Sequence, residues 1–156
     1  MKKAISGFTI VELLIVIVVI GILAAISVVA YNSVQVRARD AERISDVNQL
    51  HKALELFYAE NNYYPAVSDV RDATFRATML KIPESVVKVP GSTATISYCW
   101  ANGTNSTSQY CYVGRTPPGG SFDCTASGER CVGYTISYQL EGNPGTMITK
   151  RSLIYS

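Results

Sequence analysis

This 156-residue chain has almost no net excess of positive or negative charge. Fourteen Lys and Arg side chains face twelve Asp and Glu side chains, and the excess of +2 equals the contribution of Lys2 and Lys3. No polybasic face remains, so strong nucleic-acid binding is not indicated. Proline is absent before Pro65, so the first 64 residues contain none of the residues that most strongly break a helix.

Residues that carry metal or enzyme chemistry are also scarce. His51 is the single histidine, it lies far along the chain from the cysteines, and no Cys-x-x-Cys occurs. A zinc site is therefore disfavoured, and we expect no metal and no cofactor. No Ser/His/Asp set, phosphate loop or carboxylate pair with convincing context appears. The sequence therefore predicts a protein that is not an enzyme, with His51 at the surface or at the edge of the core.

Apolar residues concentrate near the N-terminus. The stretch from Leu13 to Ala30 has eighteen residues and no charge. Counted from Phe8, the run is long enough to cross a bilayer core of roughly 30 Å as a helix. Lys2 and Lys3 favour the cytoplasmic side for the start of the chain, which predicts a single-pass membrane protein with its C-terminus outside.

Three interpretations of this segment compete. It fits a secretory signal peptide with a small-x-small site at Ala25-Ile26-Ser27, a plain signal anchor, or a leader cut between Gly7 and Phe8. Glu12 helps to choose among them. A carboxylate inside an apolar helix costs on the order of 2.5–3.5 kcal/mol at the centre and less near an end, and an ordinary signal peptide or anchor has no use for it. A neighbouring subunit offsets this penalty if it supplies a buried cation, such as the α-amine freed at Phe8. The alternative is a tolerated charge at the membrane interface.

The residues around Glu12 resemble a known family. Gly7-Phe8-Thr9-Ile10-Val11-Glu12-Leu13, after a short Lys-bearing leader and before a long apolar helix, is similar to the N-terminus of type IV pilins, which type II secretion pseudopilins and competence pilins share. The resemblance is close from Ser6 to about Ala25. It implies that a prepilin peptidase cleaves after Gly7, that Phe8 becomes N-methylated, and that Glu12 pairs with the Phe8 amine of an adjacent subunit.

One departure from that family concerns the middle of the helix. Many members have a proline at the position of Val29, and their helix often unwinds between that proline and a glycine that corresponds to Gly21. Here Gly21 is the single weak point, at about 1 kcal/mol relative to alanine. Unwinding near Gly21 on assembly therefore does not follow directly from the resemblance.

The helical pattern continues beyond the apolar run. Beyond Val36, apolar residues recur at three- and four-residue steps, at Ile44, Val47, Leu50, Leu54 and Phe57. The charged residues between them predict a solvated face: Arg39, Asp40, Glu42, Arg43, Asp46, Lys52, Glu55 and Glu60. The helix should end near Asn61-Asn62, because Asn tolerates a left-handed cap and Pro65 follows. We therefore expect a leader over residues 1–7, a long helix over 8–62 with residues 8–30 in the membrane or filament core, and a head over 63–156.

The head should hold a small antiparallel sheet packed on the amphipathic half of the helix, an α+β, pilin-like fold. A short helix or loop is expected over residues 70–81. The expected strands are Ser85–Val89, Thr93–Trp100, Gln109–Gly114, Val132–Leu140 and Thr146–Tyr155. Residues 141–145 predict a turn between the last two. Asn102 and Asn105 match the N-glycosylation pattern, but a polar loop tip is the simpler interpretation.

All four cysteines lie in the C-terminal third, which predicts disulfides in an oxidising compartment. Three pairings are open. Cys99 and Cys111 flank a polar segment that a hairpin would close, and Cys124 and Cys131 would then close a short loop. Each bond should stabilise the head by about 2–4 kcal/mol.

The sequence thus predicts a structural subunit of a type IV pilus, held in the membrane as a precursor and exposed on the cell surface as a filament. The resemblance implies three kinds of partner: other copies of the subunit, the prepilin peptidase, and an inner-membrane assembly platform with its ATPase. The alternatives are a pseudopilin of a type II secretion or DNA-uptake system and, from another class, a membrane-anchored or secreted binding domain.

Overall fold

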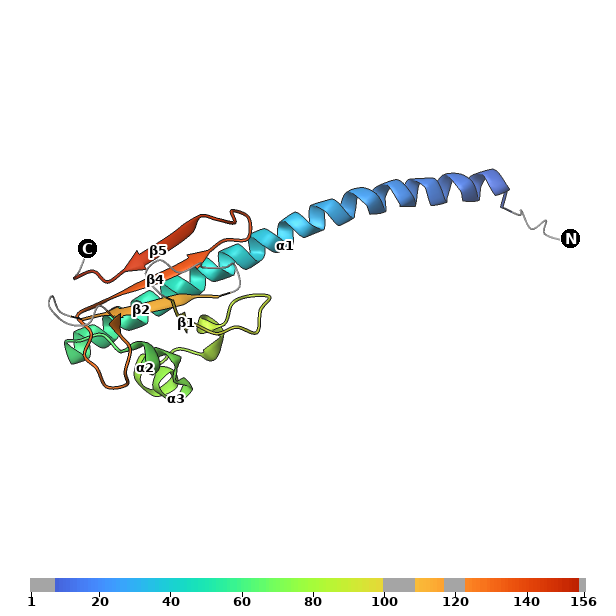
Figure 1. The fold of residues 1–156 in the computed structure, drawn as a ribbon. Coiled ribbons are helices and arrows are strands. Elements are labelled where there is room, and N and C mark those ends of the chain that lie inside the picture. Colours follow the sequence, from blue (N-terminus) through green and yellow to red (C-terminus); the bar gives the residue numbers. More distant parts are fainter. Residues whose placement is uncertain (1–7, 100–108, 117–122, 155–156) are drawn as a thin grey trace, which may run out of the picture. The chain divides into compact units, whose positions relative to one another are not determined.

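Helix α1 is the longest element of the structure and belongs to two compact units. The structure is a computed structural model, and it describes residues 8–99, 109–116 and 123–154. The units are Met1–Val36 and Arg37–Ser156. Helix α1, Ile10–Asn61, contributes its first part to one unit and its second part to the other (Figure 1). The two units are described separately below.

The described part of the first unit is a helix with apolar side chains on all of its faces. The large aliphatic side chains from Ile10 to Val28 are exposed. Between Phe8 and Val36, Glu12 is the one charged residue. Among the described residues, α1 is the one helix that is long and apolar enough to cross a membrane, by length and composition. A helix that is apolar all round needs lipid or other helices to cover it.

The C-terminal end of α1 confirms the sequence expectation. The helix ends at Asn61, and Asn62 follows in the left-handed conformation with φ 61°. The Asn62 amide donates to the carbonyl of Tyr58 at 2.7 Å, which satisfies one of the last carbonyls of the helix. Asparagine tolerates this backbone better than most residues, and Pro65 cannot continue the helix.

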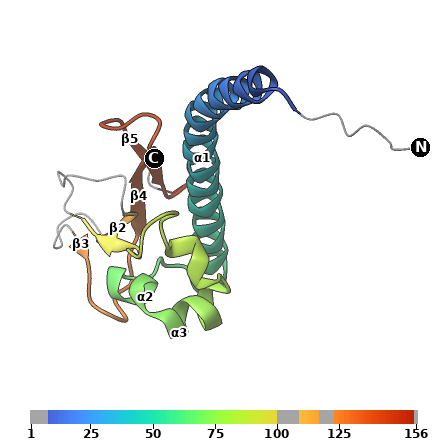
Figure 2. The ribbon, with the colours of Figure 1, turned by 90° about the vertical axis from the view of Figure 1, so that its right-hand side faces the viewer.

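The second unit contains a five-stranded sheet beside α1. The strands are β1 (Ser97–Tyr98), β2 (Cys111–Arg115), β3 (Asp123–Cys124), β4 (Gly133–Gln139) and β5 (Met147–Arg151). Their order is β1-β2-β4-β5, and β3 also pairs with β2. Figure 2 shows β4 and β5 alongside the second part of α1, with α2 (Val67–Arg71) and α3 (Ala73–Phe75) near its C-terminal end.

The prediction of a purely antiparallel sheet is wrong at one pair of strands. β1 runs parallel to β2, with Ser97 opposite Cys111 and Tyr98 opposite Tyr112. The other pairs, β2–β3, β2–β4 and β4–β5, are antiparallel. The α+β fold is confirmed, with a small mixed sheet. A hairpin between the first two cysteines was the wrong local model, because parallel strands need a longer connection.

The segment between α1 and β1 differs most from the sequence prediction. The strand expected over Ser85–Val89 is instead a 3₁₀ helix, η2 (Glu84–Val87). Val86 and Val87 are adjacent and both buried, which a helical turn permits and the alternation of a strand does not. The helix or loop expected over residues 70–81 is α2, α3 and a π-helix, η1 (Arg76–Leu80).

The remaining strands are shorter than expected, and one was missed. The segment Thr93–Trp100 contains only the two-residue β1, with Trp100 outside the described residues. Strand β3 was not expected at all. The turn between β4 and β5 is confirmed, and its Gly145 has φ 94°, a conformation that favours glycine.

The core of the second unit lies between α1 and the sheet. Its buried side chains come from α1, from the segment after it and from β2 and β4. The largest are Tyr64, Tyr110, Tyr112, Tyr134, Phe57, Leu50 and Leu54. Large aromatic side chains with a hydroxyl group need polar partners when buried. These partners are acids of α1 for Tyr64, Tyr110 and Tyr134, and the carbonyl of Pro65 for Tyr112.

Candidate functional site

The N-terminal end of α1 is closed by a pair of residues that bind each other. The Thr9 amide donates to Glu12 Oε2 at 2.8 Å, and the Thr9 hydroxyl donates to the same oxygen at 2.7 Å. In return the Glu12 amide donates to Thr9 Oγ1 at 3.3 Å. Ile10 is the first residue of α1, so Thr9 is the N-cap and Glu12 the third helical residue. This is the reciprocal arrangement called a capping box.

The capping box gives Glu12 a role that the sequence prediction missed. The signal was present in Thr9-Ile10-Val11-Glu12, the threonine-x-x-glutamate pattern of a capping box. In the isolated chain the carboxylate accepts from the amide and the hydroxyl of Thr9 at its own helix N-terminus, where negative charge is favoured. Both hydrogen bonds use Oε2; among the described residues, Oε1 is not seen to accept one.

The predicted processing site can be followed only in part. Gly7 lies outside the described residues, while Phe8 is 80% exposed at the start of the described chain. The pairing of Glu12 with an amine of another subunit stays a prediction.

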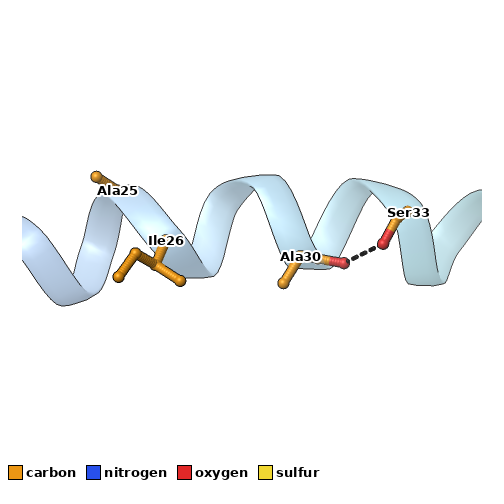
Figure 3. Close-up of a pocket in the computed structure, with 4 residues that line it drawn as sticks. All are labelled: Ala25, Ile26, Ala30 and Ser33. Atoms are coloured by element: carbon orange, nitrogen blue, oxygen red, sulfur yellow. Dashed lines mark hydrogen bonds between the residues drawn. The ribbon is translucent and has the colours of Figure 1, made fainter.

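The apolar part of α1 also contains a short surface of small side chains. Ala25, Ile26, Ala30 and Ser33 line an open notch (Figure 3). The Ser33 hydroxyl donates to the carbonyl of Ala30 at 2.9 Å, and that of Ser27 to Leu23 at 2.8 Å. The hydroxyl groups are therefore satisfied within their own helix and do not need water. Small residues let another helix approach closely in an apolar environment.

In the second unit, charged residues of α1 hold the turn between β4 and β5. Arg39 binds both carboxylate oxygens of Glu141, with distances of 2.8–3.1 Å. Arg43 donates to Glu141 Oε1 at 2.5 Å and to the carbonyl of Gln139 at 2.9 Å. Asp40 accepts hydrogen bonds from the amides of Glu141 and Gly142. One turn of α1 thus binds both a side chain and the backbone of the loop.

The interpretation of the charged face of α1 as solvated is therefore wrong in part. Arg43 is only 2% exposed and Asp46 is also buried, whereas Ile44, expected on the apolar face, is 41% exposed. Arg43 is buried because its guanidinium meets Glu141 and the Gln139 carbonyl, partners almost one hundred residues away in sequence. Helical periodicity alone does not identify such partners.

Glu55 binds two tyrosines at the boundary between α1 and the sheet. The hydroxyl groups of Tyr64 and Tyr134 each donate to a Glu55 oxygen at 2.8 Å. His51 Nδ1 lies 2.5 Å from the Tyr134 hydroxyl. Burial lowers the pKa of His51, and Lys150 lowers it further, while burial raises the pKa of Tyr134. His51 thus lies at the edge of the core, as expected, in a network that attaches α1 to β4.

A second buried acid lies one helical turn after Arg43. Asp46 accepts a hydrogen bond from the hydroxyl of Tyr110 at 3.1 Å. Burial raises the pKa of Asp46 to about 6, with a smaller upward contribution from the charge of Glu42. Burial likewise raises the pKa of Tyr110. The head therefore contains an acid that titrates in the mildly acidic range.

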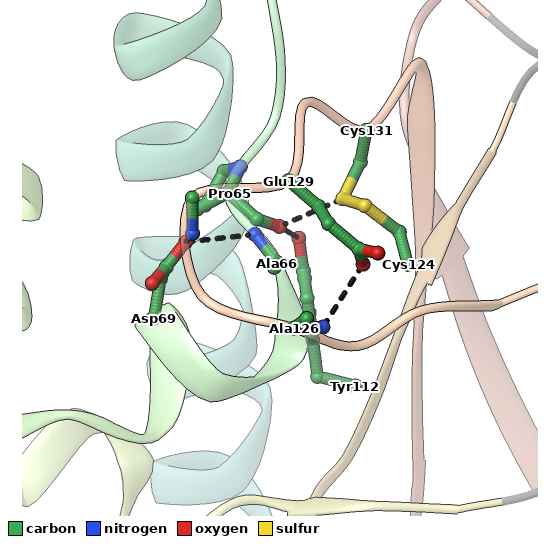
Figure 4. Close-up of a disulfide and its surroundings, with 9 residues drawn as sticks. Pro65, Ala66, Asp69, Tyr112, Cys124, Ala126, Glu129 and Cys131 are labelled. Carbon is green, nitrogen blue, oxygen red and sulfur yellow. Dashed lines mark hydrogen bonds between the residues drawn. A yellow bond between two sulfur atoms is a disulfide. The ribbon is translucent and has the colours of Figure 1, made fainter.

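Both disulfide pairs that the sequence favoured are present. Cys99 is bonded to Cys111, and Cys124 to Cys131. Figure 4 shows the second bond beside Pro65, whose carbonyl accepts a hydrogen bond from the Tyr112 hydroxyl at 2.7 Å.

Nearby, Asp69 of α2 attaches the disulfide-closed loop. It accepts hydrogen bonds from the Ser127 hydroxyl at 2.5 Å and the Gly128 amide at 3.3 Å. In the part of the chain that the structure describes, no group of three or more His, Cys, Asp or Glu side chains is placed to hold a metal ion.

Comparison with known proteins finds similarity over less than half of the chain. Residues 2–28 match the model of the prokaryotic N-terminal methylation motif. The type II secretion system core protein G of Aeromonas hydrophila is 36% identical over 72 residues, which cover 46% of this chain and 50% of that protein. The type IV major fimbrial protein FimA of Dichelobacter nodosus is 44% identical over 61 residues, which cover 39% of this chain and 35% of that protein.

A third relative is the type IV major pilin protein PilA of Myxococcus xanthus, 38% identical over 58 residues, which cover 37% of this chain and 26% of that protein. The chain thus spans about half, or less, of the length of these relatives. No solved structure matches.

An apolar N-terminal helix followed by a small, disulfide-bonded α+β head defines a pilin-like protein. Residues 2–28 match the prokaryotic N-terminal methylation motif, and the chain is similar over 58 to 72 residues to type IV pilins and to the core protein G of type II secretion.

Proposed function

We propose that this chain is a structural subunit of a type IV pilus filament, assembled through the apolar part of α1 after its leader is removed. The observation that carries the proposal is the exposed apolar surface of α1, whose one charged residue before Arg37 is Glu12. A helix apolar on all faces is covered in turn by lipid and by the same helices of other copies. The methylation motif and the similarity to named pilins support this function.

Processing is proposed to occur between Gly7 and Phe8. The residues that match the methylation motif include both. A prepilin peptidase would cut this bond and the Phe8 amine would be methylated, so that mature chains begin with an apolar side chain and a cation. Lys2 and Lys3 would keep the leader on the cytoplasmic side before the cut, with the head outside.

Glu12 is proposed to join neighbouring subunits. A carboxylate in an apolar environment needs a partner, and the freed Phe8 amine of another copy would be a cation of matching charge. The capping box supports this role, because it holds one carboxylate oxygen and leaves Oε1 for another donor. The pair would set the register between copies. An inner-membrane platform and its ATPase would extract subunits from the bilayer.

The proposed role is structural, without catalysis. The relatives are named as pilin, fimbrial and core proteins, and the head uses its buried acids to bind tyrosines and arginines of its own chain. The second candidate is a pseudopilin of a type II secretion or DNA-uptake system, favoured by the match to core protein G over 72 residues. A membrane-anchored or secreted binding domain is the alternative from another class.

Mass spectrometry of the mature chain, combined with electron microscopy of shed filaments, tests the proposal. A methylated Phe8 at the N-terminus of a chain recovered as the main component of filaments supports a pilus subunit. Methylated chains found only in the cell envelope, without surface filaments, indicate a pseudopilin. A mature chain that begins at Val28, or an intact Met1, rejects both. The variant Gly7→Ala should accumulate as the uncut precursor, and undiminished processing would reject the assigned site.

A further inference from the structure

The two disulfides of the head lie in different surroundings. Cys124 and Cys131 are 1% and 0% exposed and belong to the apolar core. Cys99 is half-buried and lies outside that core, whereas its partner Cys111 is only 2% exposed. Thiol–disulfide exchange requires that a thiolate reach a sulfur atom along the axis of the bond, so access governs its rate.

The buried disulfide is held on both sides. Gly114 lies directly against it: a Cβ atom there would lie 2.9 Å from Cys131 Sγ and 2.8 Å from the carbonyl oxygen of Cys124. The backbone of Cys131 pairs with that of Tyr64 in both directions, at 2.8 and 3.0 Å. A reductant therefore reaches this bond only when the core opens.

The Cys99–Cys111 bond lies beside β1, a strand of only two residues at one end of the strand order. Cys99 directly follows β1, which pairs with β2 only through Ser97 opposite Cys111 and Tyr98 opposite Tyr112. The side-chain amide of Gln109 lies near both sulfur atoms, 3.4 Å from Cys99 Sγ and 3.9 Å from Cys111 Sγ, so this bond has a polar neighbour. Besides the strand pairing, the Tyr98 hydroxyl donates a hydrogen bond to Asp123 of β3. Two residues of parallel pairing and one side-chain hydrogen bond hold a strand weakly, so the disulfide supplies much of the attachment of β1 to β2.

We propose that Cys99–Cys111 is a redox-sensitive tether, which a dithiol opens in the folded head while Cys124–Cys131 stays intact. A thiolate of the dithiol attacks Cys99 Sγ, the sulfur–sulfur bond breaks, and its electron pair leaves on Cys111 Sγ, which takes up a proton. The second thiolate of the reagent then displaces Cys99 Sγ, which is protonated in turn. The dithiol becomes a cyclic disulfide, and the protein gains two thiols.

Opening the tether frees β1 without unfolding the head. Ile96, just before β1, stays in place because it is buried and its amide donates to the carbonyl of Val87 at 2.8 Å. The pairing of Ser97 and Tyr98 with β2 is lost, which exposes backbone donors and acceptors of Cys111 and Tyr112. An exposed strand edge is a surface on which another strand pairs, so reduction converts a closed edge of the sheet into an open one.

The first test measures the order of reduction in the full-length chain. The protein, in detergent micelles and without denaturant, is treated with graded dithiothreitol, alkylated and mapped by mass spectrometry. Cys99 and Cys111 should be alkylated at least ten times faster than Cys124 and Cys131, which should react at a similar rate only after denaturation. Equal rates, or faster alkylation of Cys124 and Cys131, would overturn the proposal.

The second test follows two amides by hydrogen exchange. The Ser97 amide donates to the carbonyl of Tyr110 at 2.9 Å, and the Cys131 amide to that of Tyr64 at 3.0 Å. Partial reduction should raise exchange at Ser97 at least tenfold and leave Cys131 unchanged. The double variant Cys99→Ser and Cys111→Ser should reproduce this pattern without a reductant. Unchanged exchange at Ser97 after the bond has opened, or a parallel rise at Cys131, contradicts a local tether. Neither test depends on filament formation.

Discussion

Thr9 and Glu12 bind each other in both directions at the start of α1, with the Thr9 hydroxyl 2.7 Å from Glu12 Oε2 and the Glu12 amide 3.3 Å from Thr9 Oγ1. An acid in an apolar helix therefore has a partner before any second subunit arrives. The carboxylate is fixed at the helix N-terminus in a defined rotamer, which reduces the conformational entropy that pairing with another chain would remove.

This relationship predicts that the Thr9 hydroxyl promotes assembly. Thr9→Val has nearly the same volume but lacks the hydroxyl, and Thr9→Ser keeps it. An N-cap contributes about 1 kcal/mol, so Thr9→Val should lower the yield of filaments roughly five-fold while Thr9→Ser stays near wild type. Shed filaments are quantified by immunoblot against total processed subunit. Equal yields from the two variants would show that the hydroxyl is not needed.

Glu12→Gln tests the charge of the same side chain. The amide is close to the carboxylate in size and still accepts a hydrogen bond from Thr9, but it does not pair with an ammonium ion as an anion does. We expect cleavage after Gly7 to proceed normally and filament yield to fall by at least ten-fold. Normal filaments from this variant would exclude a charge pair with the Phe8 amine.

Local signals in the sequence were enough for the long helix and its end. The absence of proline before Pro65 predicted an unbroken helix, and Asn61-Asn62 before Pro65 predicted its end, which the left-handed Asn62 confirms. The capping box is equally local, but the interpretations of Glu12 from the sequence were only a partner on another chain or a tolerated charge at the membrane interface. Its threonine-x-x-glutamate spacing would have predicted it.

Features that depend on distant parts of the chain were not predictable in this way. Arg43 is buried only because Glu141 approaches it from the β4–β5 turn, and nothing near Arg43 in the sequence indicates that partner. The pairing of β1 with β2 is likewise parallel, with Ser97 opposite Cys111, whereas the hairpin interpretation assumed an antiparallel pair. Hydrophobic periodicity indicates which face of a helix or strand is buried, but it does not identify the distant residues that this face contacts.

Glu141 and Arg39 both help to attach the β4–β5 turn to α1, but their replacement should lower the free energy of unfolding by different amounts. Glu141→Gln leaves the guanidinium of Arg43 buried without a carboxylate, which should lower the free energy of unfolding by about 3–5 kcal/mol. Arg39→Met should cost less than about 1 kcal/mol, because the Arg39 side chain is one-third exposed. Urea unfolding of the full-length chain in detergent, followed by near-UV circular dichroism, measures both.

A matched control for these variants is Arg37→Met. Arg37 is exposed and is the first residue of the same unit, so its replacement should change the free energy of unfolding by less than about 0.5 kcal/mol. The double variant Glu141→Gln with Arg43→Met should recover part of the loss, since the unpaired charge is then gone. A double variant as unstable as the sum of its single variants would mean that the two side chains do not act as a pair.

Asp46 predicts a pH dependence of head stability with a definite sign. Burial raises the pKa of Asp46 from 3.8 to about 6 in the folded protein, so between pH 4 and 6 the folded state binds a proton that the unfolded chain has released. The free energy of unfolding should therefore be greatest, for this group, below about pH 4 and should fall as the pH rises to about 6. A shift of about two units corresponds to roughly 3 kcal/mol at most.

His51 has the opposite effect on stability, because its lowered pKa removes stability as the pH falls. The difference in stability between wild type and Asp46→Asn therefore isolates the contribution of Asp46, since His51 is present in both proteins. Relative to the variant, wild type should lose thermal stability between pH 4 and 6 and show a constant difference above about pH 7. Glu60→Gln, which removes an exposed carboxylate of the same helix, serves as the control and should leave the wild-type pH profile unchanged. Parallel profiles of wild type and Asp46→Asn across this range would mean that Asp46 is ionised in the folded head and that the Tyr110 hydroxyl offsets its burial.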